Sequence, residues 1–125
     1  MRIAISTVII LDNRILLVKK RETWILPGGK PEESESDIEC LCREVKQELS
    51  ETQLEEFQYY KTFEGKTPYS GDLLQARVYF SRINGQLHGP SSEISGVEWI
   101  NEFSEYNISE ITLKVINELK RDSYL

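Results

Sequence analysis

The sequence is poor in the residue types that build disulfide-linked or zinc-stabilised folds. It has two cysteines and one histidine in 125 residues. Cys40 and Cys42 lie two positions apart, which excludes the usual disulfide framework, and there is no second pair to complete a zinc site. We expect both to be free thiols in a reducing compartment. His88 stands beside Gly89-Pro90, a setting more typical of a loop residue than of a catalytic one.

The chain also lacks a long apolar run and an excess of positive charge. No stretch approaches the ~20 apolar residues of a membrane span. Residues 3–11 are apolar, but Asp12-Asn13-Arg14 follows without a small-residue cleavage site, so we expect a strand rather than a signal peptide. The net charge of −6 disfavours a nucleic acid polymer or an anionic membrane as partner, because both reward a basic stripe. A cytoplasmic location is expected.

What is present is the composition of one globular domain. Hydrophobic residues make up 39% of the chain and charged residues 29%, and this length buries a core without covalent staples. Strands are predicted at 3–11, 14–18, 24–26, 56–63, 73–83 and 97–100. A terminal amphipathic helix is predicted from the helical spacing of Ile108, Ile111, Val115, Ile116 and Leu119. The order indicates a single mixed α/β domain over residues 1–125.

Residues 27–51 are crowded with acidic side chains, and their mutual repulsion destabilises a compact state unless positive charge compensates it. Ser36 and Glu39 form a capping-box pattern, so a helix is predicted from Asp37 to about Leu49. At about 100° per residue, one stripe of this helix meets the core. That stripe contains Ile38, Leu41, Cys42, Val45 and Leu49. The adjacent stripe faces a cleft or water and contains Glu44, Gln47, Glu48 and Glu51.

Glu44 and Glu48 are one helical turn apart, which places two like charges side by side. A hard divalent cation prefers oxygen ligands and would turn this repulsion into a binding site. The alternative from charge alone is a solvated acidic face, because the repulsion costs only ~0.2 to 0.5 kcal/mol. The spacing of the whole stretch favours the cation site.

That spacing resembles the Nudix box, G-x5-E-x7-R-E-U-x-E-E-x-G-U, where U is apolar. Gly29 and Glu35 match its beginning, and residues 43–48 match its end; the approach Trp24 to Gly28 is also similar to the family's. The resemblance implies a Nudix fold: an α/β/α sandwich with a mixed β-sheet, the box helix and a C-terminal helix. It also implies a Nudix pyrophosphohydrolase, dependent on Mg²⁺ (or Mn²⁺), in which water attacks phosphorus in a nucleoside diphosphate linked to another group.

The resemblance assigns metal-binding and catalytic roles. Glu44 and Glu48 are implied as metal ligands, with the Gly28 carbonyl as a further donor. Gln47 replaces a family Glu and offers an amide oxygen without charge, so the site should bind metal more weakly. Glu93 resembles a family glutamate that lies six residues before a tryptophan, and is a further candidate ligand. Glu44, Glu48 and Glu93 are all candidates for the general base.

Supporting roles follow from the same box. Arg43 is expected to pair with Glu35 or to orient Glu44, because its guanidinium fork holds a carboxylate in one rotamer. The alternative is a surface ion pair of little energetic value. Gly29 allows a close backbone approach to a ligand. The candidate substrate-binding residues are Gly29, Trp24 and Glu35.

The sequence leaves the substrate open. Pro68 and Tyr69 lie near the positions that family subgroups use for ADP-ribose and for dinucleoside polyphosphates, so neither decides. Strand aromatics are more often core than base-stacking platforms. Candidate phosphate contacts are Lys61, Lys66, Arg77 and Arg82.

Two classes of function therefore stand. The first is the hydrolase, with a small-molecule nucleotide or nucleotide derivative as substrate. The second is a non-catalytic Nudix-fold nucleotide-binding or regulatory module with an impaired metal site, favoured by Gln47 and by Ser50, which replaces a family Gly. Glu51 is a hypothetical replacement for the charge missing at Gln47. Exposed strand edges are compatible with a monomer or a homodimer.

Overall fold

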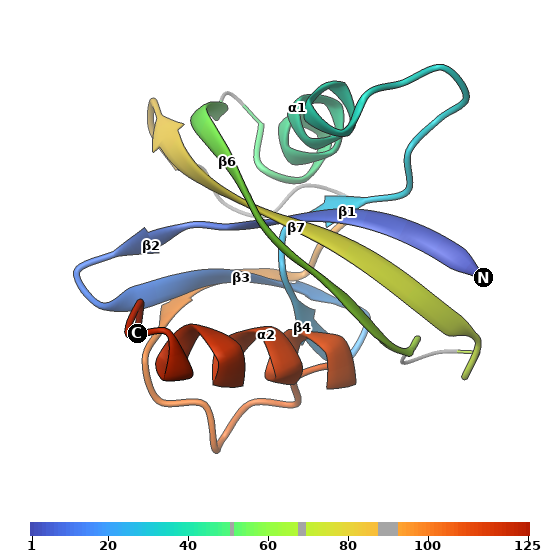
Figure 1. Ribbon diagram of the computed structural model, residues 1–125. Coiled ribbons are helices and arrows are strands. Elements are labelled where there is room, and N and C mark those ends of the chain that lie inside the picture. The colour runs from blue at the N-terminus through green and yellow to red at the C-terminus, as the bar shows by residue number, and fades with distance from the viewer. Residues whose placement is uncertain (51, 68–69, 88–92) are drawn as a thin grey trace.

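Two helices enclose the strands from opposite sides in a computed structural model, which describes residues 1–50, 52–67, 70–87 and 93–125. Helix α1 (Asp37–Glu48) covers one side and helix α2 (Glu110–Arg121) the other, as Figure 1 shows. The predicted α/β/α sandwich with its two helices is confirmed. None of the helices in the described ranges is long and apolar enough to cross a membrane.

Within the described residues, the strands form two sheets rather than one. The first is mixed: β1 (Arg2–Val8) pairs in parallel with β7 (Leu73–Asn84), and the other pairings are antiparallel. Its spatial order is β5-β1-β7-β6, with β5 at Gly28–Gly29 and β6 at Gln53–Lys66. The second sheet is antiparallel. It contains β2 (Ile10–Leu11), β3 (Arg14–Lys20), β4 (Thr23–Ile25) and β8 (Gly96–Ile100).

The single strand predicted at residues 3–11 is wrong in one respect. The chain leaves the first sheet after Val8 and enters the second at Ile10. Ile9 lies between, and its carbonyl accepts a hydrogen bond from the Leu16 N–H at 3.0 Å, which starts the new pairing. The Asp12-Asn13 turn is confirmed, since both residues have positive φ (52° and 60°), as a tight hairpin requires.

The main core lies between the sheets and α2. Helix α2 contributes buried residues to this core, as the apolar pattern near the C-terminus predicts: Ile111, Val115, Ile116 and Leu119. Ile108 is also buried, but it precedes the N-cap Ser109 and forms an isolated bridge with Trp24. The segment that leads into α2 is therefore attached to β4 before the helix begins.

Helix α1 begins as predicted. The Ser36 hydroxyl accepts from the Glu39 N–H at 3.1 Å, and the Glu39 carboxylate accepts from the Ser36 N–H at 2.9 Å. Its buried side differs from the predicted stripe, because Cys40 is buried and Cys42 is exposed. Both are free thiols, as expected. The helix is turned so that Cys40 contacts the Gly29 carbonyl and Glu48 faces the Gly28 N–H.

Candidate active site

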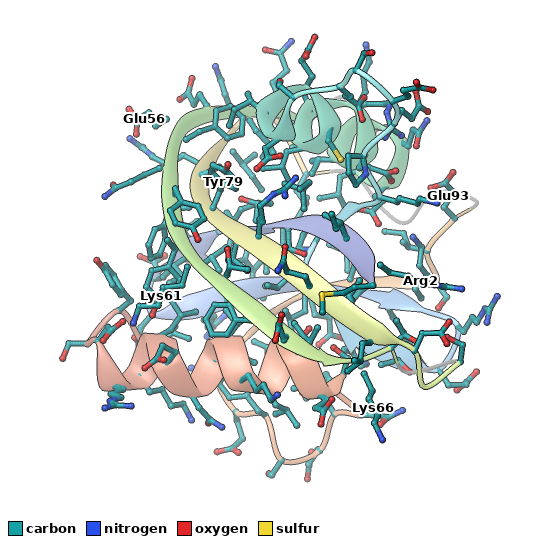
Figure 2. All side chains as sticks on the ribbon, turned by 45° about the vertical axis from the view of Figure 1, so that its right-hand side comes forward. Arg2, Glu56, Lys61, Lys66, Tyr79 and Glu93 are labelled. Carbon is teal, nitrogen blue, oxygen red and sulfur yellow. The ribbon has the colours of Figure 1, made fainter. Side chains whose placement is uncertain are left out.

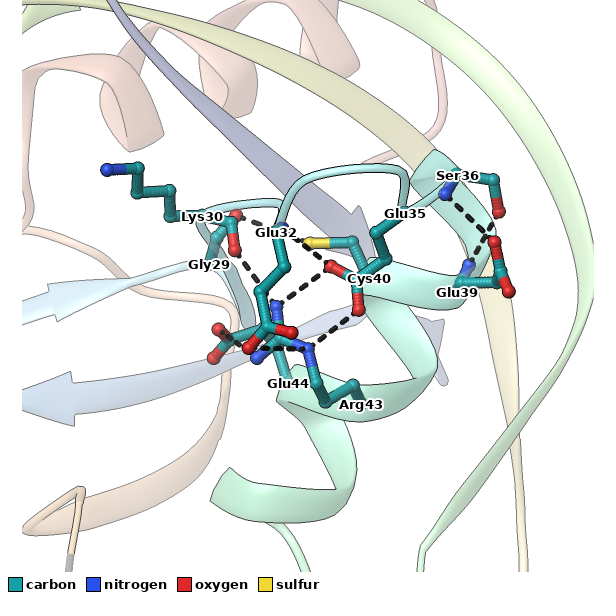
Figure 3. Close-up of polar contacts among 9 residues, drawn as sticks. All are labelled: Gly29, Lys30, Glu32, Glu35, Ser36, Glu39, Cys40, Arg43 and Glu44. Atoms are coloured by element: carbon teal, nitrogen blue, oxygen red, sulfur yellow. Dashed lines mark hydrogen bonds and ion pairs between the residues drawn. The ribbon is translucent and has the colours of Figure 1, made fainter.

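Arg43 ties the loop before α1 to the helix. Its Nε and one Nη donate to the two oxygens of Glu35 at 2.7 and 2.9 Å, in the two-pronged geometry that suits a guanidinium. The other Nη donates to Glu44 Oε1 at 2.9 Å, and the Lys30 carbonyl accepts a further bond at 3.0 Å. Figure 3 shows these contacts converging on one guanidinium. Both predicted pairings of Arg43 are present together.

This arrangement shifts the pKa values of Glu35 and Arg43. The Arg43 hydrogen bond is the main cause that lowers the pKa of Glu35 to about 2, assisted by the N–H of Glu32. The pKa of Arg43 is raised above its ordinary value, first by its bond to Glu35. Glu35 is therefore ionised throughout the physiological range. Its carboxylate is fully engaged in positioning Arg43 and hence Glu44.

Glu44 rests directly on the glycine turn. A Cβ added at Gly29 would lie 2.4 Å from the Glu44 carboxyl carbon, so any other residue there would displace the carboxylate from this position. The Glu44 side chain is 13% exposed and its Oε1 is held by Arg43. Its rotamer is thus fixed from one side by a cation and from the other by bare backbone.

Gly28 has a second steric role. Its φ is +143°, and a Cβ there would lie 2.1 Å from the Ile5 carbonyl oxygen of the neighbouring strand β1. Any other residue would be strained and would separate the two strands. The turn is thereby pressed against β1, and its backbone N–H is directed at α1.

Glu48 is the most unusual residue of the site. Its side chain is completely buried, which corrects the prediction that it lies on the outward stripe. Oε1 accepts from the Gly28 N–H at 3.0 Å, whereas Oε2 has no hydrogen-bond partner among the described residues. Lys20 Nζ lies 3.5 Å from Oε2. Burial raises the pKa of Glu48 to about 7, against the opposing effects of the Gly28 N–H and of Lys20.

A cavity of about 570 Å³ opens above these groups. It is lined by Lys20, Arg21, Gly29, Lys30, Glu44, Gln47 and Glu93. The structure thus brings together Gly29 of the glycine turn, Glu44 and Gln47 of α1, and Glu93 of the segment before β8. Glu48 is not one of these lining residues, but its Oε2 lies 3.5 Å from the Nζ of Lys20, which is one of them. Glu51 lies outside the described residues.

The oxygens that line this cavity, together with the buried carboxylate of Glu48 next to Lys20, fit a hard divalent cation. Such ions take carboxylate, amide and carbonyl oxygens, and the site offers the carboxylates of Glu44 and Glu48 with the Gln47 amide beside them. The buried, unbonded Oε2 of Glu48 is an oxygen that a cation would satisfy. In the described part of the chain, no three histidine, cysteine or acidic side chains converge into a metal-binding group. A cation here therefore depends on two carboxylates and on neutral oxygens.

Cys40 restricts which carbonyl of the turn is available. Its thiol donates to the Gly29 carbonyl at 3.7 Å. Burial raises the pKa of Cys40 to about 12, so the thiol stays protonated and remains a donor. The Gly29 carbonyl is partly occupied, which leaves Gly28 as the predicted carbonyl ligand.

A second cavity of about 530 Å³ adjoins the first and shares Lys20, Arg21 and Gly29 with it. Its floor is apolar, with Ile25, Leu26, Leu74, Ala76 and Ile111 among the lining residues. Its lining also includes the cationic residues Arg2 and Lys66, and Figure 2 places these two and Glu93 along the same side of the molecule. Arg2 is already paired with Asp72 at 3.2 Å.

Other predicted substrate contacts are placed elsewhere. Trp24 is 9% exposed and packs edge-on against Tyr106 in the core. Three of the four candidate phosphate contacts already have acidic partners: Lys61 with Asp122, Arg77 with Asp37, and Arg82 with Glu56. Pro68, Tyr69 and His88 lie outside the described residues.

Sequence reasoning missed Lys20, Arg21 and Lys30. The basic run Lys19-Lys20-Arg21 ends strand β3, and its approach to Glu48 depends on the pairing of β3 with β4. The sequence signal for these residues is the cluster of basic side chains shortly before the glycine turn. Its link to the site depends on the fold, which places the turn and α1 next to β3.

Comparison with known proteins agrees with this geometry. The family model for the NUDIX domain matches residues 1–109. Among curated relatives, the mRNA-decapping protein g5R of African swine fever virus (isolate Warthog/Namibia/Wart80/1980) is 33% identical over 90 residues. The match covers 62% of this chain and 37% of the viral protein, so the chain spans little more than a third of the length of that relative.

Solved structures share the fold. The MutT NUDIX hydrolase from Burkholderia pseudomallei superposes with a TM-score of 0.79 at 23% identity, covering 94% of this chain and 97% of that one. The E. coli ORF135 protein gives 0.77 at 22% identity, over 98% and 92%. The NUDIX domain of Shewanella oneidensis NrtR, complexed with ADP ribose, gives 0.78 at 16% identity, over 98% and 88%.

Proposed function

Because the chain belongs to the NUDIX domain family, we propose that it is a Mg²⁺-dependent hydrolase of a nucleoside diphosphate linked to another group. The reaction is the attack of water on phosphorus in the pyrophosphate bond. The single observation that carries the proposal is the buried Glu48 carboxylate beside Glu44 and the glycine turn, whose Oε2 accepts no hydrogen bond from the described part of the chain. Burying a carboxylate this deeply is costly unless a cation or donor compensates it.

Each residue has a role in this proposal. Glu44 and Glu48 hold the cation, and Gln47 with the Gly28 carbonyl supplies neutral oxygens. Bound Mg²⁺ neutralises the diphosphate and lowers the pKa of the attacking water. Arg43 holds Glu44 in one rotamer, a role that its 2.9 Å hydrogen bond to Glu44 Oε1 supports.

The proton acceptor is a carboxylate at the cavity. Glu93 and Glu44 both line it, together with Gln47. Either accepts the proton of water, and Glu48 is the third candidate. A comparison of kcat in Glu93→Gln and Glu44→Gln orders them.

The substrate occupies the adjoining cavity. Its apolar floor suits a nucleoside, and Lys20 and Arg21 at the shared border suit the phosphates. The net charge of −6 favours a small nucleotide derivative over an RNA chain. The viral relative is named a decapping protein, so a capped RNA fragment is the competing substrate in any test.

The decisive experiment is a panel of nucleoside triphosphates, nucleotide sugars, ADP-ribose, dinucleoside polyphosphates and capped RNA, each with Mg²⁺ or Mn²⁺. Release of phosphate, pyrophosphate or nucleoside monophosphate is measured. We expect turnover that needs the metal and is abolished by Glu48→Gln. Exposed Glu105 provides the matched control, Glu105→Gln, which keeps full activity.

A non-catalytic binding module is the second candidate, favoured by the neutral Gln47 in the cavity lining. Tight nucleotide binding with no release from any member of the panel would establish it. Restoring the missing charge in Gln47→Glu tests the same point from the other direction. A hydrolase should gain metal affinity from this change.

A further inference from the structure

Lys20 occupies a distinctive place at the end of strand β3. Its backbone is opposite Thr23 of β4, and its Nζ lies 3.5 Å from Glu48 Oε2. The Lys20 side chain is 32% exposed, whereas Glu48 is not exposed at all. Lys20 also lines both cavities. The Lys20 ammonium is therefore next to the buried Glu48 carboxylate and also accessible from the two cavities.

Glu44 and Glu48 each have a cation of the protein beside them. Glu44 has Arg43 at 2.9 Å, and Glu48 has Lys20 at 3.5 Å. The two contacts differ in kind. Arg43 binds Glu44 with a guanidinium that also donates to Glu35 and to the Lys30 carbonyl. Lys20 faces Glu48 Oε2 with an ammonium at 3.5 Å, on a flexible four-carbon stem.

The oxygen that Lys20 faces is the one that a divalent cation needs. Oε1 of Glu48 is engaged by the Gly28 N–H, so Oε2 is the oxygen left for a metal. An ammonium and a divalent cation repel each other strongly at contact distance, because Coulomb repulsion between like charges grows as the distance between them falls. Both cannot share Oε2.

Resting on the proposed metal site, we propose that Lys20 is a positioning residue that acts as a displaceable counterion of Glu48. Its ammonium compensates the buried carboxylate in the metal-free protein and leaves Oε2 when a divalent cation binds. Metal affinity is thus set by competition between the ion and a side chain of the same chain. Gln47 strengthens this competition, because it is neutral and adds no negative charge that could hold the ammonium and the metal ion at the site together.

The test is a titration of the whole purified protein with Mn²⁺, in which free Mn²⁺ is measured by electron paramagnetic resonance without any nucleotide. Lys20→Met removes the competing cation and should tighten Mn²⁺ binding about tenfold. Lys20→Arg retains a cation and should not tighten it. Lys19→Met is the matched control: it removes the same charge from the adjacent residue, whose side chain points to the other face of the strand. It should change affinity less than twofold.

Thermal unfolding gives an independent readout and checks that each variant folds. Lys20→Met should lower the melting temperature of the metal-free protein and increase the rise in melting temperature caused by Mn²⁺. If Lys20→Met does not fold, Lys20→Gln removes the charge while keeping a polar group. Weaker Mn²⁺ binding, or a gain no larger than that of Lys19→Met, would overturn the counterion role. If the wild type itself binds no Mn²⁺ and hydrolyses nothing, the proposed function fails instead.

Discussion

Replacing Glu48 by Gln should stabilise the metal-free protein at alkaline pH while removing its function. Burial raises the pKa of Glu48 to about 7 from an ordinary value of 4.5. A carboxyl group with a raised pKa in the folded state contributes its full stability below its unfolded pKa, and this contribution is lost as the pH rises through about 7. At about 1.4 kcal/mol per pH unit, the total loss is about 3 kcal/mol. Gln avoids this loss because it has no charge.

The structure also indicates that Gln fits in place of Glu48. An amide oxygen can still accept the Gly28 N–H bond, which spans 3.0 Å in the wild type. Lys20 loses its ion pair with Glu48, but its side chain is 32% exposed, so water can solvate the ammonium. The variant therefore carries no new buried unpaired charge.

The assay is urea unfolding in the presence of a chelator at pH 5 and at pH 8. We expect the difference in unfolding free energy between Glu48→Gln and wild type to increase by about 2 kcal/mol from pH 5 to pH 8, in favour of the variant. Glu105→Gln, on the exposed surface, should show no such pH-dependent difference. A difference that stays constant with pH, or that favours the wild type at pH 8, would refute the reasoning.

Three further changes test the geometry around Arg43 and the glycine turn. Gly29→Ala places a Cβ 2.4 Å from the Glu44 carboxyl carbon, so Mn²⁺ affinity measured by calorimetry should fall at least tenfold; unchanged affinity would contradict the steric role. Arg43→Lys loses the two-pronged bond to Glu35, and kcat should fall by about 10- to 100-fold with little change in KM; a change confined to KM would assign Arg43 to the substrate. Glu35 has a pKa lowered to about 2, so its pairing contributes stability above about pH 4.5 that is lost as the pH falls toward 2. Glu35→Gln should flatten this acid-side loss in urea unfolding, and an unchanged profile would argue against it.

The architecture of the site was largely predictable from spacing. The capping box at Ser36, the glycine turn and the terminal apolar pattern each encode local structure in local sequence. Arg43 and Glu35 follow for the same reason, since the helix and the loop that precedes it are contiguous. These features need only short-range geometry, so a single sequence carries them.

Features that depend on how distant segments meet were not predictable. Glu48 is charged, and a helical pattern assigns charged residues to the outer face, yet the Gly28 N–H and Lys20 make its burial possible. Lys20 itself is 28 positions away and approaches only because β3, β5 and α1 pack together. Trp24 looked like part of the substrate approach, but its bridge to Ile108 draws it into the core.

The central claim is that Glu44 and Glu48 jointly bind a divalent cation beside the Gly28-Gly29 turn. The most direct test is a crystal soaked in Mn²⁺ and measured at a wavelength where manganese scatters anomalously. The account predicts one anomalous peak in contact with a carboxylate oxygen of each residue, with the Lys20 ammonium moved away from Glu48. An ion bound elsewhere, or no ion while Lys20 still contacts Glu48, would contradict it.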